Sequence, residues 1–145
     1  MPKEAQEVIE RRINTALQVL IGGAVLRNER VARELGLNVV DLQTFGLIAR
    51  HDGPMSPGEV VRAAGLPGST VTRVIDRLVD AGFVRRTPSE TDRRRVEIAA
   101  IAERVPEVVS HYEGITAQMR EFNQRFDGDE LAIVARYLEA IAEAT

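Results

Sequence analysis

One uninterrupted helical pattern at the start of the chain constrains the fold more than any other feature of the sequence. No proline lies between Lys3 and Leu35. At ~1.5 Å per residue such a helix reaches roughly 50 Å, which is longer than a compact domain of this size is wide. We therefore expect its apolar stripe to pack against a second subunit. That stripe recurs at the three-to-four spacing of one helix face, at Ile9, Ile13, Ala16, Leu20 and Ala24.

Two adjacent glycines, Gly22 and Gly23, lie inside this expected helix. Each glycine costs about 1 kcal/mol in a helix interior, because it loses more conformational freedom on folding than alanine does. The pair marks either a weak point or kink of the helix, or a place where a neighbouring backbone approaches closely. The sequence leaves both interpretations open.

Capping signals predict three shorter helices between residues 38 and 82. A short polar side chain before a helix accepts a hydrogen bond from its first turn, proline fits the first helical position, and glycine ends helices. The expected starts and stops are, in order, Asn38 and the breaker segment 51–54, Ser56 and Gly65, and Gly68 and Gly82. The third helix has an apolar face made of Val71, Val74, Ile75 and Leu78.

A hairpin and two helices are expected in the remainder of the chain. Residues 83–86 and 95–98 have the composition of short strands, and the turn-rich segment 87–92 joins them. One helix is expected to start near residues 102–103, because Pro106 fits only a first turn. Its apolar residues alternate three and four positions apart, as in a helix packed on another helix: Val105, Val108, Tyr112, Ile115, Met119, Phe122 and Phe126. A last helix follows the capping signal at residues 127–130, with the stripe Leu131, Val134, Leu138 and Ile141.

The composition is that of one mainly helical, soluble domain. The chain has 145 residues, four Phe, two Tyr and no Trp, so aliphatic side chains must fill its core. It has no cysteine, which excludes disulfides, thiolate metal sites and a cysteine nucleophile in this chain. The longest apolar run, Val19 to Leu26, is far shorter than the ~20 residues that span a bilayer. We expect a cytoplasmic protein.

Charge is distributed unevenly along the chain. The net charge of −3 alone argues against a nucleic-acid partner. Residues 60–95, however, hold 8 basic and 4 acidic side chains, whereas residues 96–145 hold 4 basic and 10 acidic ones. A basic centre beside an acidic end indicates that one face meets phosphate while the rest has another role.

The order of three helices and a hairpin is that of a winged helix-turn-helix, whose second motif helix enters the major groove of DNA. Ser69, Thr70 and Thr72 carry short hydroxyl side chains at the start of this expected recognition helix, within reach of base edges or phosphates. Arg73 is long enough for a bidentate contact with guanine, and Arg77, one turn later, is placed for the DNA backbone. The alternative is an amphipathic helix whose polar face meets only water.

Three consecutive arginines, Arg93, Arg94 and Arg95, lie at the expected turn of the hairpin. Phosphate, or a narrow and electronegative minor groove, would relieve their mutual repulsion. Asp92 beside them either orients one guanidinium or is a simple turn residue. With the polar residues of the recognition helix, these residues form the candidate DNA-binding set.

Three segments resemble the MarR type of bacterial transcription regulator: Gly65–Arg73, Arg77–Arg86, and Asp92–Arg94 at the turn of the hairpin. The resemblance implies a homodimer, in which the first and the last two helices interlock. It places the helix from Gly68 to Ala81 in the major groove and the arginine of the wing in the minor groove. It also implies a small-molecule site in the crevice between the dimerisation and DNA-binding parts. We thus expect one MarR-like domain over residues 1–145, with dimerisation helices at 1–36 and 102–145 and the winged helix-turn-helix at 37–101.

Two departures from the family pattern concern helix starts. After the second strand the family usually has Leu-Thr, and the threonine caps the next helix, whereas this chain has Ala100 and Ile101. Pro67 stands where a polar cap of the recognition helix is common. The starts of both helices are therefore open.

The expected function is that of a sequence-specific double-stranded DNA-binding regulator, a repressor that a small aromatic or phenolic ligand releases. Phe45 and Tyr112 are the candidate ligand-binding residues, with core packing as the alternative for both. An enzyme, a cofactor and a metal site are not expected, since His51 and His111 are the only histidines and have no metal-ligand partner at helical spacing. The competing hypothesis is a helical protein-interaction module that does not bind DNA.

Overall fold

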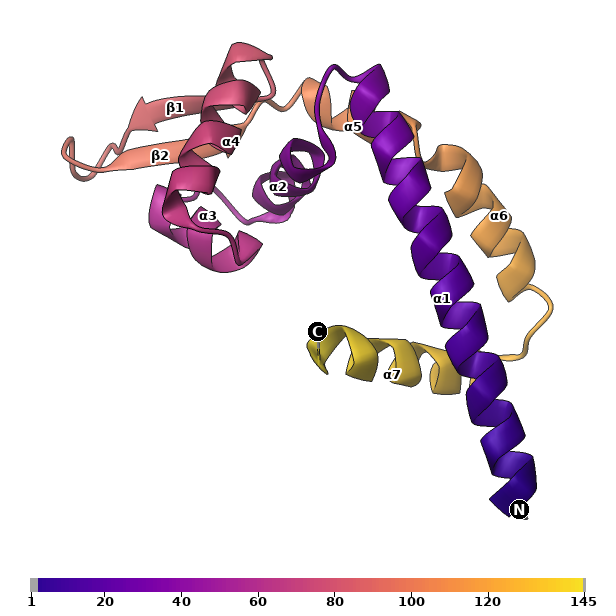
Figure 1. The fold of residues 1–145 in the computed structure, drawn as a ribbon. Coiled ribbons are helices and arrows are strands. Elements are labelled where there is room, and N and C mark those ends of the chain that lie inside the picture. Colours follow the sequence, from indigo (N-terminus) through magenta and orange to yellow (C-terminus); the bar gives the residue numbers. More distant parts are fainter. Residues whose placement is uncertain (1–2, 145) are drawn as a thin grey trace. The chain divides into compact units, whose positions relative to one another are not determined.

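The computed structural model describes residues 3–144, and contacts divide the chain into two units, one ending at Val108 and one beginning at Val109. The described residues form helices and one two-stranded antiparallel sheet, which confirms the mainly helical winged helix-turn-helix predicted from the sequence (Figure 1). The elements are α1 (Lys3–Glu34), α2 (Val39–Arg50), α3 (Pro57–Ala64), α4 (Gly68–Asp80), β1 (Val84–Pro88), β2 (Val96–Ala100), α5 (Arg104–Ser110), α6 (Glu113–Asn123) and α7 (Gly128–Ala144).

Reciprocal side-chain caps begin α2, α3 and α7 where the sequence predicted them. At α3 the Ser56 hydroxyl accepts a hydrogen bond from the Glu59 N–H at 3.2 Å, and the Glu59 carboxylate accepts one from the Ser56 N–H at 2.6 Å. Asn38 and Asp41 make the same pair of bonds at α2. Gly65 ends α3 with a φ of 64°, a left-handed conformation that glycine adopts without a steric penalty.

A single apolar core holds α2, α3, α4 and the hairpin together. The rings of Phe45 and Phe83 meet edge to face with centroids 5.3 Å apart. The predicted apolar face of α4 is confirmed, since Val71, Val74, Ile75 and Leu78 are all buried. Because this face is packed, the opposite face of α4 is presented to solvent.

The two strands and the residues between them form the wing, which extends beyond α3 and α4 (Figure 1). The strands pair antiparallel, from Val84 opposite Ala100 to Pro88 opposite Val96. Met55 and Ile98 exchange backbone hydrogen bonds of 2.8 and 2.7 Å, which tie the loop before α3 to β2. The base of the wing is therefore fixed to the helix-turn-helix.

The single helix expected after the wing is wrong in one respect, because it is interrupted between α5 and α6. Residues 111–112 form a turn, in which the Tyr112 N–H donates to the Val109 carbonyl three residues earlier. The residues around the turn are poorer helix formers than alanine or leucine, so an interruption of the helix costs little free energy here. They are Ser110, His111, Tyr112 and Gly114. Pro106 lies in the first turn of α5, as predicted.

The helices α1, α6 and α7, called here the flanking helices, bury little. In α1 only Val31 and Ala32 are buried, and α6 and α7 contain no buried residue.

Within residues 3–144 no helix is both long enough and apolar enough to cross a membrane.

Candidate nucleic-acid interface

The N-terminal half of α4 presents an uncapped helix start and short hydroxyl side chains. Pro67 occupies the cap position, and no side chain of the described residues caps α4 there. Ser69 and Thr72 are exposed and Thr70 is half-buried. The Thr72 hydroxyl donates to the Gly68 carbonyl at 3.0 Å, so its oxygen remains available as an acceptor. The partial positive charge of the helix start favours an anion at this end.

Arg73 and Arg77 are both exposed residues of α4, but the structure gives them different partners. Within residues 3–144, no hydrogen bond or ion pair is seen for the Arg73 side chain, which leaves its guanidinium available for a base edge. The Arg77 guanidinium binds the Asp41 carboxylate of α2, with Nη2 donating to Oδ1 at 2.7 Å and Nε donating to Oδ1 at 3.0 Å. The phosphate contact expected of Arg77 stays a prediction, and it competes with this ion pair.

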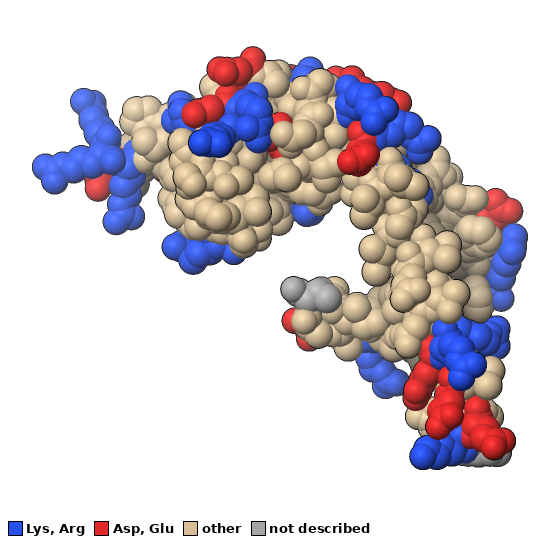
Figure 2. Space-filling model, in the orientation of Figure 1, with Lys and Arg blue, Asp and Glu red and all other residues tan. Residues whose placement is uncertain are grey.

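The tip of the wing is basic and is organised by Asp92. Arg93, Arg94 and Arg95 are exposed, and Figure 2 shows basic side chains projecting at the end of the hairpin. One Asp92 carboxylate oxygen accepts a hydrogen bond from the Arg94 N–H at 3.0 Å, and the other lies 3.8 Å from Arg95 Nε. Asp92 thus serves as a turn residue and also lies beside one guanidinium, which are the two roles predicted for it.

A link between α4 and the wing was not expected from the sequence. Arg86 Nη2 of β1 donates to Asp76 Oδ1 of α4 at 2.7 Å, and both side chains remain exposed. The two residues are ten positions apart, on α4 and on the strand that follows it. The turn between these two elements decides whether the side chains meet, and neither helical nor strand periodicity reports that.

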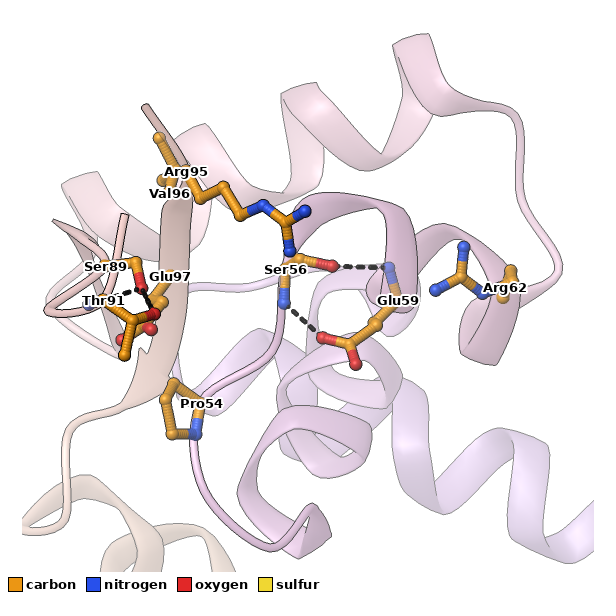
Figure 3. Close-up of a pocket in the computed structure, with 9 residues that line it drawn as sticks. All are labelled: Pro54, Ser56, Glu59, Arg62, Ser89, Thr91, Arg95, Val96 and Glu97. Atoms are coloured by element: carbon orange, nitrogen blue, oxygen red, sulfur yellow. Dashed lines mark hydrogen bonds between the residues drawn. The ribbon is translucent and has the colours of Figure 1, made fainter. Parts of the chain in front are cut away.

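A polar groove of about 340 Å³ separates α3 from the wing (Figure 3). Arg95 extends from the wing toward Ser56, while Glu59 and Arg62 line the side formed by α3. The capping bonds of Ser56 and Glu59 occupy the start of α3, and these hydrogen bonds lower the pKa of Glu59 below its usual 4.5. The groove adds Arg62 to the basic side chains near the wing. The remaining lining residues are Pro54, Ser89, Thr91, Val96 and Glu97.

The two candidate ligand-binding residues lie in different units. Phe45 is 1% exposed and belongs to the apolar core, which is the alternative the sequence left open for it. Tyr112 is half-buried at the start of α6.

His51 is exposed, and its Nδ1 lies 2.9 Å from the Gly53 carbonyl oxygen. Within residues 3–144 no cluster of His, Asp and Glu has the arrangement of a metal site.

A family model described as the MarR family matches residues 35–95, from the end of α1 to the tip of the wing. The HTH-type transcriptional regulator YcgE of Bacillus subtilis (strain 168) is 28% identical over 119 residues, which cover 82% of this chain and 77% of that protein. The HTH-type transcriptional regulator PecS of Dickeya dadantii (strain 3937) is 35% identical over 72 residues, which cover 48% of this chain and 43% of that protein.

Several solved structures are similar in fold over nearly the whole chain. FabT of Streptococcus pneumoniae, crystallised in complex with DNA, has a TM-score of 0.75 at 20% identity and covers 92% of this chain and 95% of its own. RV1404 of Mycobacterium tuberculosis has a TM-score of 0.68 at 25% identity, over 99% of this chain and 95% of its own. Apo MarR of E. coli has a TM-score of 0.63 at 18% identity, over 88% and 94%.

Proposed function

We propose that this chain is a transcriptional regulator of the MarR type, which binds double-stranded DNA sequence-specifically and represses transcription. One observation carries the proposal: the exposed polar face of α4 and the arginine-rich tip of the wing belong to elements packed on one core. Two basic elements at fixed separation suit a major groove and the minor groove beside it. The complex of FabT with DNA supports this use of the fold.

The two elements have different tasks in this proposal. The recognition helix α4 reads base edges with Arg73, while its hydroxyl side chains contact bases or phosphates. The wing inserts Arg94 into a narrow minor groove, with Asp92 holding the turn. The residues proposed to contact or support DNA are Ser69, Thr70, Thr72, Arg73, Asp92, Arg93, Arg94 and Arg95. Arg77 lies on the same helix, but Asp41 holds its guanidinium, so we assign it no base contact.

A homodimer supplies the second recognition helix. The flanking helices expose large apolar side chains that a second copy of the chain would cover, Leu20, Phe122 and Leu138 among them. Two-fold symmetry then predicts recognition helices roughly 34 Å apart and a pseudo-palindromic site with half-sites about one DNA turn apart. Repression would follow if such a dimer occupied DNA to which RNA polymerase has to bind. Release by a small aromatic or phenolic ligand remains a prediction, with Tyr112 as the candidate that is not in the core.

A salt series with three alanine variants tests DNA binding. Wild-type affinity for duplex DNA should fall steeply with salt, because bound phosphates release counterions. Arg73→Ala should cost about 1–3 kcal/mol on the preferred site and flatten the sequence preference. Arg94→Ala should weaken binding chiefly to sites with a narrow, A·T-rich minor groove, and Asp92→Ala should do so to a smaller extent.

Arg33→Ala, an exposed arginine of α1, is the matched control and should leave sequence preference unchanged. If Arg73→Ala and Arg94→Ala keep wild-type affinity and preference while the fold stays intact, the regulator proposal fails. A helical protein-interaction module would then take its place.

A further inference from the structure

One carboxylate, that of Asp41, joins the start of α2 to the recognition helix. The Asp41 side chain accepts a hydrogen bond from the Asn38 N–H at 3.3 Å, as part of the cap of α2. It also accepts hydrogen bonds from two nitrogens of the Arg77 guanidinium, at 2.7 Å from Nη2 and at 3.0 and 3.1 Å from Nε. Since Nε and Nη2 face the same carboxylate, the contact fixes direction as well as distance.

Burial makes this contact different from the other ion pair of α4. The side chain of Asp41 is 3% exposed, whereas the Asp76 and Arg86 side chains are 52% and 40% exposed. A buried carboxylate without a partner is strongly unfavourable, and an exposed ion pair contributes little. Arg77 is therefore constrained by Asp41 far more than Arg86 is by Asp76.

The ion pair also changes what Arg77 contributes to a DNA interface. A carboxylate at 2.7 Å leaves the pair with no net charge, and its hydrogen bonds raise the pKa of Arg77 above its ordinary value. A group without net charge displaces no counterion from DNA, so it adds nothing to the salt dependence of binding. The neighbouring Arg73 has no such partner among the described residues.

We propose that Asp41 and Arg77 form a positioning pair, which sets the orientation of the recognition helix on α2 so that Arg73 meets its base. In this proposal Arg77 acts by orienting α4 on α2, which replaces the phosphate contact predicted for it from the sequence. The inference rests on the proposed DNA-binding function. It links sequence preference to a residue of α2, outside the elements that carry the DNA-contacting side chains.

Two conservative substitutions test the pair without leaving a buried charge unpaired. Arg77→Lys keeps the positive charge and loses the bidentate contact. Asp41→Asn removes the negative charge, and water can then solvate the Arg77 side chain, which is 45% exposed. In each variant we expect roughly ten-fold weaker binding to the preferred duplex, about the loss of one recognised base pair, with unchanged binding to a scrambled duplex. The slope of affinity against salt should equal that of the wild type.

The opposite pattern would identify a phosphate contact. Arg77→Lys would then bind like the wild type, Asp41→Asn would bind every duplex more tightly, and Arg77→Gln would lower the salt slope by about one unit per subunit. That result overturns this inference alone, whereas a wild-type protein that does not bind duplex DNA overturns the proposed function with it. Asp76→Asn and Arg86→Lys, in the exposed pair, are the controls and should change the preference less. Circular dichroism of each variant checks that the fold is intact.

Discussion

The winged part of the chain, residues 39–100, buries its large apolar side chains, whereas the flanking helices expose theirs. In the winged part, α2, α3, α4 and the hairpin close one core, in which Val60, Leu78 and Phe83 are 0% exposed. In α6 and α7 no residue is buried, and α1 buries only the pair Val31 and Ala32 near its end. The winged part closes its core within one chain, whereas the flanking helices leave the apolar surface that we propose a second copy covers.

This difference separates two kinds of stability. Contacts inside one chain do not depend on protein concentration, whereas contacts between two copies strengthen with it. The large apolar side chains exposed on the flanking helices are too many for a typical soluble monomer. They include Val19, Leu20, Ile21, Leu26, Met119, Phe122, Ile133 and Leu138. Concentration dependence is therefore the measurement that distinguishes the two regions.

Truncating one leucine in each region carries the largest expected effects. Leu78 of α4 is 0% exposed, so Leu78→Ala should cost about 2–5 kcal/mol of unfolding free energy at every protein concentration. Leu138 of α7 is 47% exposed in the single chain, so Leu138→Ala should act mainly by weakening the dimer. Urea unfolding at several concentrations, with sedimentation to detect the dimer of about 32 kDa (twice 16.0 kDa), measures both effects.

A concentration-independent loss in Leu138→Ala, equal to that of Leu78→Ala, would show that α7 is buried by its own chain. A wild-type protein that stays monomeric at micromolar concentration would remove the dimer and the two-half-site arrangement. Either result would erase the contrast between the regions.

The features that the sequence predicted well are local ones. The cap at Ser56, the stop at Gly65 and the apolar face of α4 depend on residues at most four positions apart, so their spacing specifies them directly. The interruption at residues 111–112 was missed, because the apolar seam continues across it and periodicity does not report a turn. The strands run from Val84 and from Val96, one residue later than expected at each start.

For the candidate site, the sequence predicted which charged side chains are exposed but not which partners they bind. The exposed positions of Arg73 and Arg94 follow from the apolar face of α4 and from the turn of the wing. The partner of Arg77 does not, since Asp41 is 36 positions away and belongs to a cap, which already gives its carboxylate a local role. Packing of α2 against α4 brings the two together, and such long-range pairing leaves no periodic pattern in the sequence.

Alanine at Gly22 sharpens the comparison within α1 and has a smaller expected effect. A Cβ built at Gly22 or at Gly23 meets nothing within 4 Å in the described part of the chain. Gly22→Ala should therefore raise the free energy of unfolding by about 1 kcal/mol, the difference in helix propensity between the two residues. Thermal unfolding followed by circular dichroism measures it, with Ala24→Gly as the reverse control.

Weaker dimerisation of Gly22→Ala by sedimentation would contradict this expectation. It would show that a second chain approaches the backbone of α1 closely at this point, which is the other interpretation that the glycine pair allows. The contact between copies would then be located on α1 to within a turn.

The smallest expected effect is a pH dependence of the cap of α3, which belongs to the winged part. Hydrogen bonds from the backbone N–H and then the side chain of Ser56 hold the pKa of Glu59 below 4.5. A carboxylate whose folded pKa is lowered stabilises the fold above its unfolded pKa and loses that contribution as pH falls through the folded value. The stability difference between wild type and Glu59→Gln should therefore be constant above about pH 5 and shrink below pH 4.5.

Urea unfolding across this pH range should give the same difference at low and high protein concentration. The reason is that Ser56 and Glu59 are three residues apart in one chain, and their bonds form whether or not a second copy is present. Ser56→Ala is the matched variant, since it removes the hydroxyl and keeps the carboxylate, and it should cost about 1 kcal/mol. A pH effect that grows with protein concentration would instead couple this cap to the dimer, and the winged part would no longer be complete within its own chain.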